Sequence, residues 1–362
     1  MSCRVAVTYN AKKKCTGELP IDYYSEFDSE KTINAIKDTL EDGGNEVVLV
    51  EVNYDLLDFF KNNHVDIVFN IAEGTCGNSR ESQVPAILDF LGIPYTGSGV
   101  LTLAMAMDKA MTKKILRCEN IPTPNFQLFK DYNDTIDPHL AFPLIVKPNM
   151  EGSAKGISTS SVVHNNTRLK EEVKKVIDTY HQEALVEEFI DGKEITVGIL
   201  GNGNPDVLPP MEIDFSGCKE SGEYFYSWRM KEYQGDASKH LVPTFYCPAR
   251  IDKEVERKVS DVALRAHLLL GCLDMSRIDI RLSNKDNIPY VLEVNPLPGL
   301  DPDESNLTLI AKRSGMSYKD LINGILGSAL KRNMVYQKDL KEKFGVCSIV
   351  SCGAIEERRN FH

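Results

Sequence analysis

The sequence lacks a long hydrophobic run and an excess of positive charge. Its longest apolar runs, such as residues 101–107, are far shorter than the roughly 20 residues of a membrane-spanning helix. The formal net charge is -11, whereas general nucleic-acid binding needs a basic surface. The first residues lead directly into a strand pattern, without the apolar core of a signal peptide. We therefore expect a cytoplasmic protein that binds neither membranes nor nucleic acids.

Several motifs of common catalytic and binding sites are also missing. The 9 cysteines are scattered without a Cys-x-x-Cys pair, which is typical of reduced thiols. The 7 histidines form neither His-x-x-His nor His-Glu-x-x-His, so we expect no zinc site. The Gly-x-Ser-x-Gly, Walker A and Gly-x-Gly-x-x-Gly patterns are absent, which argues against an α/β-hydrolase, a P-loop protein and a dinucleotide-binding fold.

Strand and helix patterns alternate along the first hundred residues. Apolar runs typical of buried strands cover 5–9, 46–52 and 66–71, and helical spacing covers 30–40, 56–62 and 83–91. Buried strands that alternate with helices predict a parallel sheet with covered faces, and hence an α/β fold. Ligands of such sheets bind at the carboxyl ends of the strands, where the loop after Ile71 begins.

A second unit begins near Leu101. Strand patterns at 144–147, 184–190 and 194–200 accompany helical patterns at 107–119, 168–180, 253–270 and 318–330. The polar stretch 216–240 has few strand signals and holds the only tryptophan, Trp228. Loops of that length in compact domains are usually functional covers or disordered. We expect 216–240 to close over a site.

The most informative segment lies between Arg277 and Gly299. Two strand-like runs carry Asp279, Glu293 and Asn295 at positions where a strand core would have Val or Ile. Two carboxylates and an amide oxygen on paired strands form a hard-oxygen site suited to Mg²⁺. Arg277 lies two residues before Asp279, so both side chains point to the same face of the strand.

Other polar residues have ordinary explanations when each is considered alone. The loop 151–156 has the small residues of a phosphate-binding loop, but its turn chemistry also suits a surface hairpin. Lys147 suits an edge lysine that reaches water, and Lys109 a solvated helix face. Glu187 and Glu188 suit an exposed edge strand. Together with the metal set, however, these residues supply cations for phosphates and an apolar slot for a base.

A series of short motifs strengthens this interpretation. They are Leu-Gly-Ile-Pro-Tyr-Thr-Gly-Ser-Gly-Val (91–100), Ala-Met-Asp-Lys (106–109), Ile-Val-Lys-Pro (145–148), Glu-Gly-Ser (151–153), Val-Glu-Glu-Phe (186–189) with Glu194, Arg-Ile-Asp (277–279), Leu-Glu-Val-Asn (292–295) and Pro-Gly (298–299). In this order they resemble the D-alanine–D-alanine ligases of the ATP-grasp superfamily of carboxylate–amine ligases. The resemblance covers roughly residues 1–330.

The resemblance implies an ATP-grasp fold, with an N-terminal parallel-sheet (pre-ATP-grasp) domain and ATP-binding α+β lobes. We expect a substrate-side domain at 1–105, a central lobe at 106–200, a C-terminal lobe with the metal site at 201–332 and a charged tail at 333–362. Members of the family are often dimers, so a homodimer is the assembly that the resemblance implies.

The resemblance also implies roles for individual residues. Phosphates of ATP would contact Lys109, Lys147 and Lys231, under a loop that carries Glu151 and Ser153. The adenine would lie against Glu187, Glu188, Phe189 and Ile190, and the ribose against Glu194. Two Mg²⁺ ions, with Mn²⁺ as an alternative, would be held by Asp279, Glu293 and Asn295. The catalytic set would be Arg277, Ser153 and Lys231, and the acceptor would lie near Gly299 and Ser305.

The implied reaction is ATP-dependent formation of an amide or peptide bond between a small-molecule carboxylate and an amine. A carboxylate is a poor acylating agent, so ATP first converts it to an acyl phosphate, which the amine then attacks. Phosphoryl transfer needs alignment and charge neutralisation, which metal ions and cations supply. Because water would hydrolyse the acyl phosphate, a closing loop is also needed.

The substrate half of the sequence departs from the family pattern. After the third strand, D-alanine ligases have Leu-His-Gly and then Gly-Glu-Asp-Gly, whereas this chain has Glu73 at the histidine position and a new cation, Arg80. The N-terminal Gly-Gly-x-Ser-x-Glu pattern is also missing, and Glu26 lies nearby without a clear alignment. We infer a donor other than D-alanine, with Arg80 binding a substrate carboxylate and Glu73 an amine or hydroxyl. Alternatively, Arg80 and Glu81 cap the following helix and face water.

Three other functions stay open from the sequence. One is a true D-alanine–D-alanine ligase of cell-wall synthesis. Another is a non-catalytic nucleotide-binding sensor, against which the intact set of Arg277, Asp279, Glu293 and Asn295 argues. The third is a peptide-tailoring protein that binds a carrier through the residues beyond Asn333.

Overall fold

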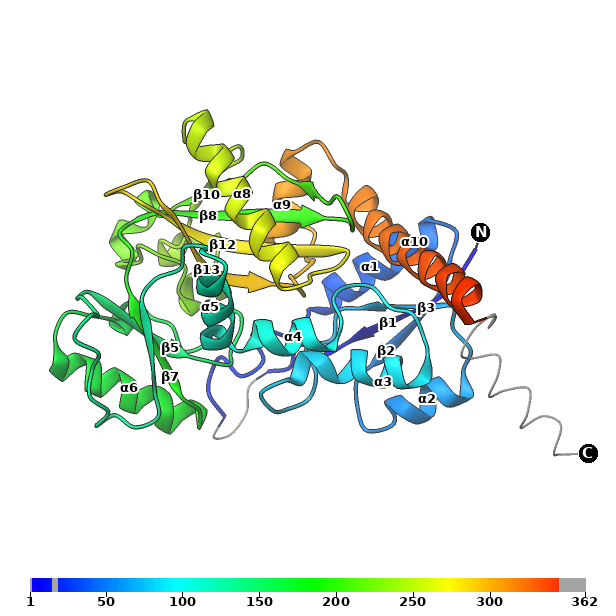
Figure 1. Cartoon of the computed structure of the whole chain (residues 1–362), viewed down its shortest axis with the longest axis horizontal. Helices are drawn as coiled ribbons and strands as arrows, with labels where there is room; N and C mark the ends of the chain where they lie inside the picture. The colour runs from blue at the N-terminus through cyan, green and yellow to red at the C-terminus, as the bar shows by residue number, and fades with distance from the viewer. Residues whose placement is uncertain (1, 15–18, 345–362) are drawn as a thin grey trace, which may run out of the picture.

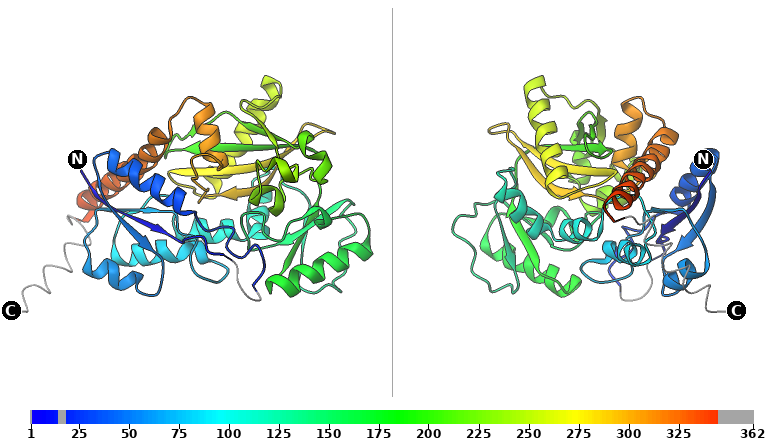
Figure 2. Two further views of the ribbon diagram at one scale, coloured as in Figure 1. Left: turned by 180° about the vertical axis from the view of Figure 1, so that it is seen from behind. Right: turned by 45° about the vertical axis from the view of Figure 1, so that its right-hand side comes forward.

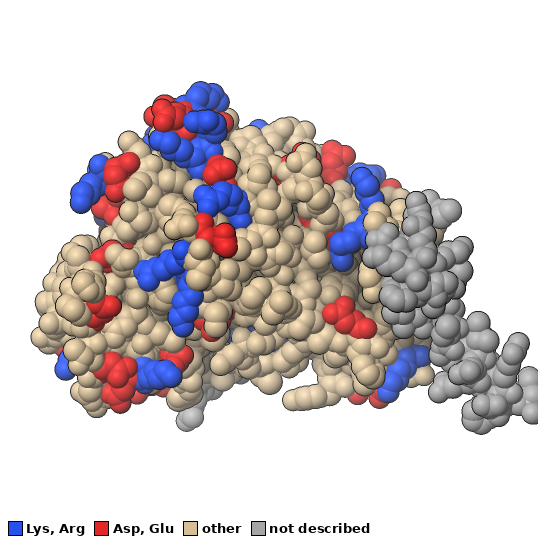
Figure 3. All heavy atoms as spheres, viewed as in Figure 1, with Lys and Arg blue, Asp and Glu red and all other residues tan. Residues whose placement is uncertain are grey.

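The computed structural model describes residues 2–14 and 19–344, which form three β-sheets with their covering helices (Figure 1). The sheets follow one another along the chain, so each belongs mainly to one segment of the sequence. No helix of the described residues is long and apolar enough to cross a membrane. On the face drawn in Figure 3, acidic and basic side chains of the described residues are interspersed.

The N-terminal sheet is parallel, as predicted. Its strand order is β2 (Glu46–Glu51), β1 (Arg4–Tyr9) and β3 (Ile67–Asn70). Val5 and Val7 pack with α1 (Glu30–Asp42), whereas Ala6 packs on the opposite face with α2 (Leu56–Asn62) and α3 (Gln83–Leu91). Both faces are therefore buried, which explains why the strands have continuous apolar runs.

The central sheet is antiparallel and has helical cover. Its strand order is β4 (Phe126–Phe129), β7 (Ala184–Glu188), β5 (Leu144–Pro148) and β6 (Val162–Val163). Helix α6 (Asn166–Tyr180) packs Leu169, Val173 and Val176 against it. Asn165 begins this helix by accepting a hydrogen bond from the backbone amide of Arg168. The opposite side of this sheet is left for the site.

The third sheet carries the predicted metal ligands Asp279, Glu293 and Asn295. Its main path runs β11 (Thr244–Tyr246), β10 (Met211–Asp214), β8 (Gly192–Leu200), β12 (Met275–Ser283) and β13 (Pro289–Asn295), and β9 (Asp206–Val207) pairs with β8. One face is covered by α8 (Lys253–Leu269), which buries Val259, Ala263 and Ala266 against the strands. The segment predicted to close over a site contains 3-10 turns at Ser216–Ser221 and Ala237–Lys239 and the short helix α7 (Trp228–Glu232).

Further helices connect the sheets. Helices α4 (Val100–Met107) and α5 (Lys109–Cys118) join the first two sheets, and α9 (Asn306–Arg313) and α10 (Tyr318–Phe344) follow the third. Figure 2 shows α10 crossing close to α1, and both helices contribute to one core cluster.

Two of the three predicted domain boundaries lie inside helices, and the third follows a strand of the third sheet. The boundary at 105/106 lies inside α4, and the boundary at 200/201 follows β8, which pairs with β12 of the third sheet. The tail predicted from residue 333 begins inside α10, which continues to Phe344. The rest of that tail, 345–362, lies outside the described residues.

Candidate active site

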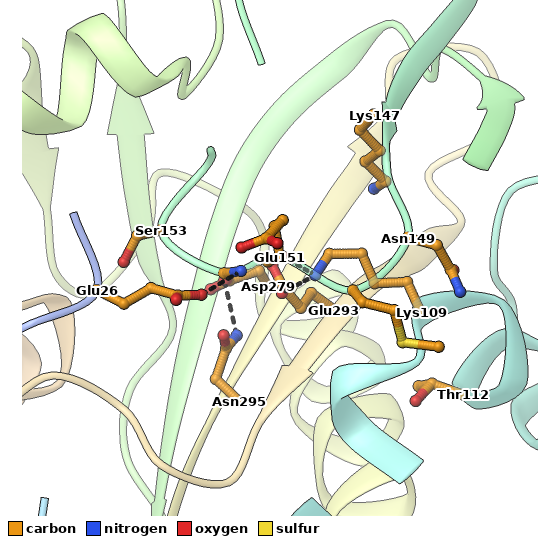
Figure 4. Close-up of polar contacts among 12 residues, drawn as sticks. Glu26, Lys109, Thr112, Lys147, Asn149, Glu151, Ser153, Asp279, Glu293 and Asn295 are labelled. Carbon is orange, nitrogen blue, oxygen red and sulfur yellow. Dashed lines mark hydrogen bonds and ion pairs between the residues drawn. The ribbon is translucent and has the colours of Figure 1, made fainter. Parts of the chain in front are cut away.

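The metal-type residues are brought together by the pairing of β12 and β13. Asp279 lies directly opposite Glu293, and Arg277 lies opposite Asn295. Ile278 and Ile280, the alternate residues of β12, are fully buried in the core beneath α8. The period of two along the strand therefore directs Arg277 and Asp279 to the other face, where Figure 4 shows Asp279, Glu293 and Asn295 converging.

Asp279 is surrounded by donors. The Arg277 guanidinium donates from Nε to Oδ1 at 3.0 Å and from a terminal nitrogen to Oδ2 at 2.8 Å. The Thr196 hydroxyl donates to Oδ1 at 2.8 Å, and Asn295 Nδ2 donates to Oδ2 at 3.0 Å. Burial opposes the charge of Arg277, but Asp279 more than offsets this and raises the pKa of the guanidinium. Arg277 is therefore held charged at the centre of the site.

Glu293 is ionised by its neighbours. Lys109 Nζ lies 2.8 Å from Glu293 Oε1. Burial alone would raise the pKa of Glu293, but the charges of Lys109, Lys147 and Arg277 lower it to about 2. A buried carboxylate that stays charged at every working pH is suited to binding a cation.

This donor set fits magnesium. Two carboxylates stand on facing residues, and Asn295 donates through Nδ2, which leaves its carbonyl oxygen to accept. These are hard oxygen ligands of the type that Mg²⁺ prefers, and phosphate oxygens commonly complete its octahedral shell. Among the described residues, no group of three or more His, Cys, Asp or Glu side chains could hold a metal ion by itself. The three candidate ligands leave coordination positions of a magnesium ion open, and phosphate oxygens would fill them.

Glu187 is the anchor of a buried charge cluster. Lys147 Nζ lies 2.7 Å from one oxygen of Glu187, and Lys113 Nζ lies 2.8 Å from the other. Burial would raise the pKa of Glu187, but the two lysines lower it overall. The prediction that Glu187 reads the adenine edge gains no support from this arrangement, because both carboxylate oxygens already face lysines. Lys113 was not predicted, although it lies one helical turn after Lys109.

The loop after β5 and the segment 216–240 meet above this cluster. Ser153 and Ala154 have φ angles of 52° and 56°, so the chain turns sharply there. Lys231 Nζ donates to Ser153 Oγ at 3.1 Å, and the Trp228 backbone amide donates to Ile157 O at 3.0 Å. Burial, helped by Arg277, lowers the pKa of Lys231 to about 8. The segment is thus docked on the loop, as its predicted closing role requires.

A cavity of about 110 Å³ lies between these elements. Its apolar lining includes Ile145, Ile213 and Leu292, none of which was predicted from the sequence. Every residue predicted to contact ATP lines this cavity: Lys109, Lys147, Glu151, Ser153, Glu187, Glu188, Phe189, Ile190, Glu194 and Lys231. The cavity thus combines apolar walls with lysines at one end, which suits a flat base joined to phosphates.

A second cavity, of about 220 Å³, lies on the N-terminal side. It shares Ser153, Tyr226, Lys231, Arg277 and Asn306 with the first cavity. Three of the predicted substrate residues line it, namely Glu73, Gly299 and Ser305. A side chain at Gly299 would have its Cβ 2.9 Å from Ser305 Oγ, so glycine is needed for this close approach.

Arg80 has a different role from the predicted one. One terminal nitrogen of Arg80 lies 2.6 Å and 2.7 Å from the two oxygens of Glu26. The other terminal nitrogen donates to Met150 O at 3.0 Å. Arg80 is 8% exposed and does not line the second cavity, so neither a substrate carboxylate nor water is its partner. Glu26 in turn accepts from the Gly152 amide at 2.6 Å. The pair therefore ties the N-terminal domain to the loop above the first cavity.

Three acidic side chains face the second cavity with raised pKa values. Burial is the largest cause for each, and neighbouring carboxylates add to it. The pKa of Asp28 rises to about 7, that of Glu81 to about 8, and that of Glu73 well above its ordinary value. The Glu73 and Glu81 carboxylates were expected at this loop, but their grouping with Asp28 was not.

Comparisons with known proteins identify the family. The family model described as D-ala D-ala ligase C-terminus matches residues 115–327. The uncharacterized protein y4sG of Sinorhizobium fredii is 37% identical over 266 residues, which cover 74% of this chain and 75% of that protein. The D-alanine–D-alanine ligase of Desulforamulus reducens is 34% identical over 305 residues, which cover 80% of this chain and 89% of the enzyme.

A solved structure agrees with these relatives. The D-alanine–D-alanine ligase of Bacillus anthracis, in complex with ATP, matches with a TM-score of 0.70 at 25% identity and covers 92% of this chain and 100% of its own. The predicted α/β class and ATP-grasp fold are confirmed. The chain belongs to the D-alanine–D-alanine ligase family of ATP-grasp proteins and is an ADP-forming ligase.

Proposed function

We propose that this ligase joins a small carboxylate to an amine through an acyl phosphate, and that its donor is not D-alanine. The observation that carries the proposal is the junction of the two cavities. Ser153, Lys231 and Arg277 line both of them, so cationic and hydroxyl groups stand where a nucleotide and a substrate would meet. A phosphoryl group passing between two bound molecules needs such a junction.

The first cavity would bind ATP. Its apolar walls would hold the adenine, Glu194 the ribose, and Lys109 and Lys147 the phosphates. Magnesium ions, two in this proposal and replaceable by Mn²⁺, would be held by Asp279, Glu293 and Asn295 and would screen phosphate charge. Lys113 would act indirectly, since it holds Glu187 beside Lys147.

The reaction would occur at the junction in two steps. A carboxylate oxygen of the donor attacks the γ-phosphorus of ATP, and ADP leaves with the electrons of the broken bond. The amine nitrogen then attacks the acyl carbon, phosphate leaves, and the amine loses a proton. Arg277, with its raised pKa, stays charged beside the transferred group in both steps. The docked segment around Trp228 and Lys231 keeps water from the acyl phosphate.

The second cavity supports a donor other than D-alanine. Glu73 stands where the D-alanine ligases have histidine, and it lines the cavity together with Glu81. Arg80 does not contribute a cation there, because Glu26 occupies it. An anionic wall in place of a neutral or cationic one changes which substrate groups are bound favourably.

The test is ATP-dependent ADP release, with amide formation followed by mass spectrometry, across a panel of amino-acid donors and acceptors. The proposal expects amide formation with a pair other than two D-alanines and little activity with D-alanine alone. Efficient D-alanyl-D-alanine formation at a low KM would instead identify a cell-wall ligase. ADP release that no pair stimulates would favour the nucleotide-binding sensor.

A further inference from the structure

The second cavity has an excess of acidic side chains without partners. Of its lining carboxylates, Glu26 pairs with Arg80, Glu232 with Lys12 and Asp301 with Lys31. Four others have no ion-pair or side-chain hydrogen-bond partner within residues 2–14 and 19–344: the exposed Glu304, and the half-buried Asp28, Glu73 and Glu81. Partial burial raises the pKa of Asp28, Glu73 and Glu81.

These carboxylates come from three separate parts of the N-terminal domain. Asp28 precedes α1, Glu73 follows β3, and Glu81 lies in the 3-10 turn before α3. They are close enough for Glu81 and Asp28 both to raise the pKa of Glu73. Like charges brought together from distant segments destabilise the fold unless a proton or a cation neutralises them.

A second, independent feature also points to a bound molecule. Asn306 is 7% exposed and lines both cavities, at the first residue of α9. Its Oδ1 is buried and has no hydrogen-bond partner among the described residues. An unsatisfied buried acceptor is rare in folded proteins, so it needs a donor from outside the chain. An N–H group of a ligand in either cavity would supply that donor.

We propose that the second cavity binds a substrate whose side chain ends in an ammonium or guanidinium group, as in a basic amino acid. The extra cation would lie between Asp28, Glu73 and Glu81, and Asn306 Oδ1 would accept from a substrate N–H. This inference rests on the proposed function, because it takes the second cavity as the substrate site. The cavity volume of about 220 Å³ is many times the roughly 10–15 Å³ that one water needs.

The charge pattern favours this occupant over a neutral one. One α-ammonium group could neutralise only part of the charge of three carboxylates, so a substrate without a cationic side chain would leave the others to stay protonated. A cationic group converts the same repulsion into attraction, and hydrogen bonds to charged groups are stronger than those between neutral groups. Lys231 and Arg277, which line both cavities, would face the donor carboxylate and the phosphates at the junction.

The experiment is isothermal titration of the full-length protein, saturated with Mg²⁺ and a non-hydrolysable ATP analogue. The probes are matched pairs in both enantiomers: arginine against citrulline, lysine against norleucine, and ornithine against norvaline. Arginine and citrulline have nearly the same shape, whereas norleucine and norvaline lack the charged nitrogen of lysine and ornithine, so the arginine pair isolates the effect of charge best. The proposal expects at least one basic member to bind about tenfold or more tightly than its neutral match, as a charged hydrogen bond requires.

Two variants test which residues produce the preference. Glu73→Gln and Glu81→Gln keep side-chain size and each should reduce the preference to a few-fold. Asp303→Asn is the control, because Asp303 is exposed, pairs with Lys31 and does not line the cavity. Unchanged affinity for the ATP analogue checks that each variant is folded.

Equal binding of the matched pairs, or no binding of any basic probe, overturns the inference. A preference that survives in both variants also overturns it. The proposed function fails separately, if no donor and acceptor pair stimulates ADP release. A protein that forms amides only from neutral substrates would refute the cationic subsite and leave the proposed reaction standing.

Discussion

The buried ion pair between Arg80 and Glu26 gives the sharpest structural prediction. Side-chain exposure is 10% for Arg80 and 4% for Glu26, so the pair is largely removed from water. Arg80→Met leaves the Glu26 carboxylate with Lys155, 3.5 Å away, and the Gly152 amide as its remaining partners. The buried Glu26 carboxylate would then still be removed from water, but fewer hydrogen bonds and ion pairs would stabilise its charge.

We expect Arg80→Met to lower the free energy of unfolding by about 3–5 kcal/mol, the usual cost of leaving a buried charge without its partner. The double variant Arg80→Met with Glu26→Gln should recover most of this loss, because the charge of Glu26 is removed and Lys155 and Glu151 still pair with each other. The pair lowers the pKa of Glu26 in the folded protein. Its contribution is therefore present above the unfolded-state pKa and is lost as the pH falls through the folded-state pKa.

Urea unfolding followed by circular dichroism at pH 7 measures the effect. Lys61→Met is the matched control, since Lys61 and Asp58 form an exposed pair on α2, with side chains 51% and 74% exposed. Its removal should change the free energy of unfolding by less than about 1 kcal/mol. A loss for Arg80→Met no larger than for Lys61→Met would refute the reasoning, as would a double variant less stable than the single one.

Three further predictions follow from the site. Trp228→Phe removes the 2.7 Å hydrogen bond from Nε1 to Ser25; we expect more ADP per amide formed, and an unchanged ratio would contradict a closing role. Glu293→Gln removes a carboxylate held ionised by a pKa of about 2, so the rate of ADP formation should fall about 10²–10³-fold at saturating Mg²⁺; near-normal rates would exclude Glu293 as a ligand. Binding of arginine at pH 7 should release protons, because a cation favours the ionised forms of Asp28 and Glu81, whose pKa values are about 7 and 8. Titrations in buffers of different ionisation enthalpy detect that release, and proton uptake would contradict it.

The grouping of the residues predicted to bind ATP and metal could be inferred from the sequence, because many of them lie on regular strands and helices. Arg277 and Asp279 are two residues apart on β12, so the alternation of a strand predicts that both side chains point to the same face. Glu293 and Asn295 show the same alternation on β13. Lys113 could have been found as well, since it follows Lys109 by one helical turn on α5.

The substrate half could not be predicted in the same way because its contacts join loops that are distant in sequence. Arg80 and Glu26 are separated by 54 residues, and the segment around Glu26 has no helix or strand to fix its direction. Arg80 was therefore interpreted as a free cation, whereas the fold neutralises it. The charged residues from 333 to 344 continue α10, because charged residues also suit a solvated helix.

Because Glu26 neutralises Arg80, the acidic residues near Arg80 indicate a different kind of substrate. With a free Arg80, Glu73 and Glu81 would stand beside a cation, and the cavity would suit a second carboxylate. With Arg80 paired to Glu26, no described cation remains within hydrogen-bonding distance of Glu73, Glu81 or Asp28. One interaction between two loops thus reverses the sign of the group that this end of the cavity binds best. In the proposed reaction, the chemistry would depend on Arg277, Asp279, Glu293 and Asn295, whereas the choice of substrate would depend on which carboxylates the protein leaves unpaired.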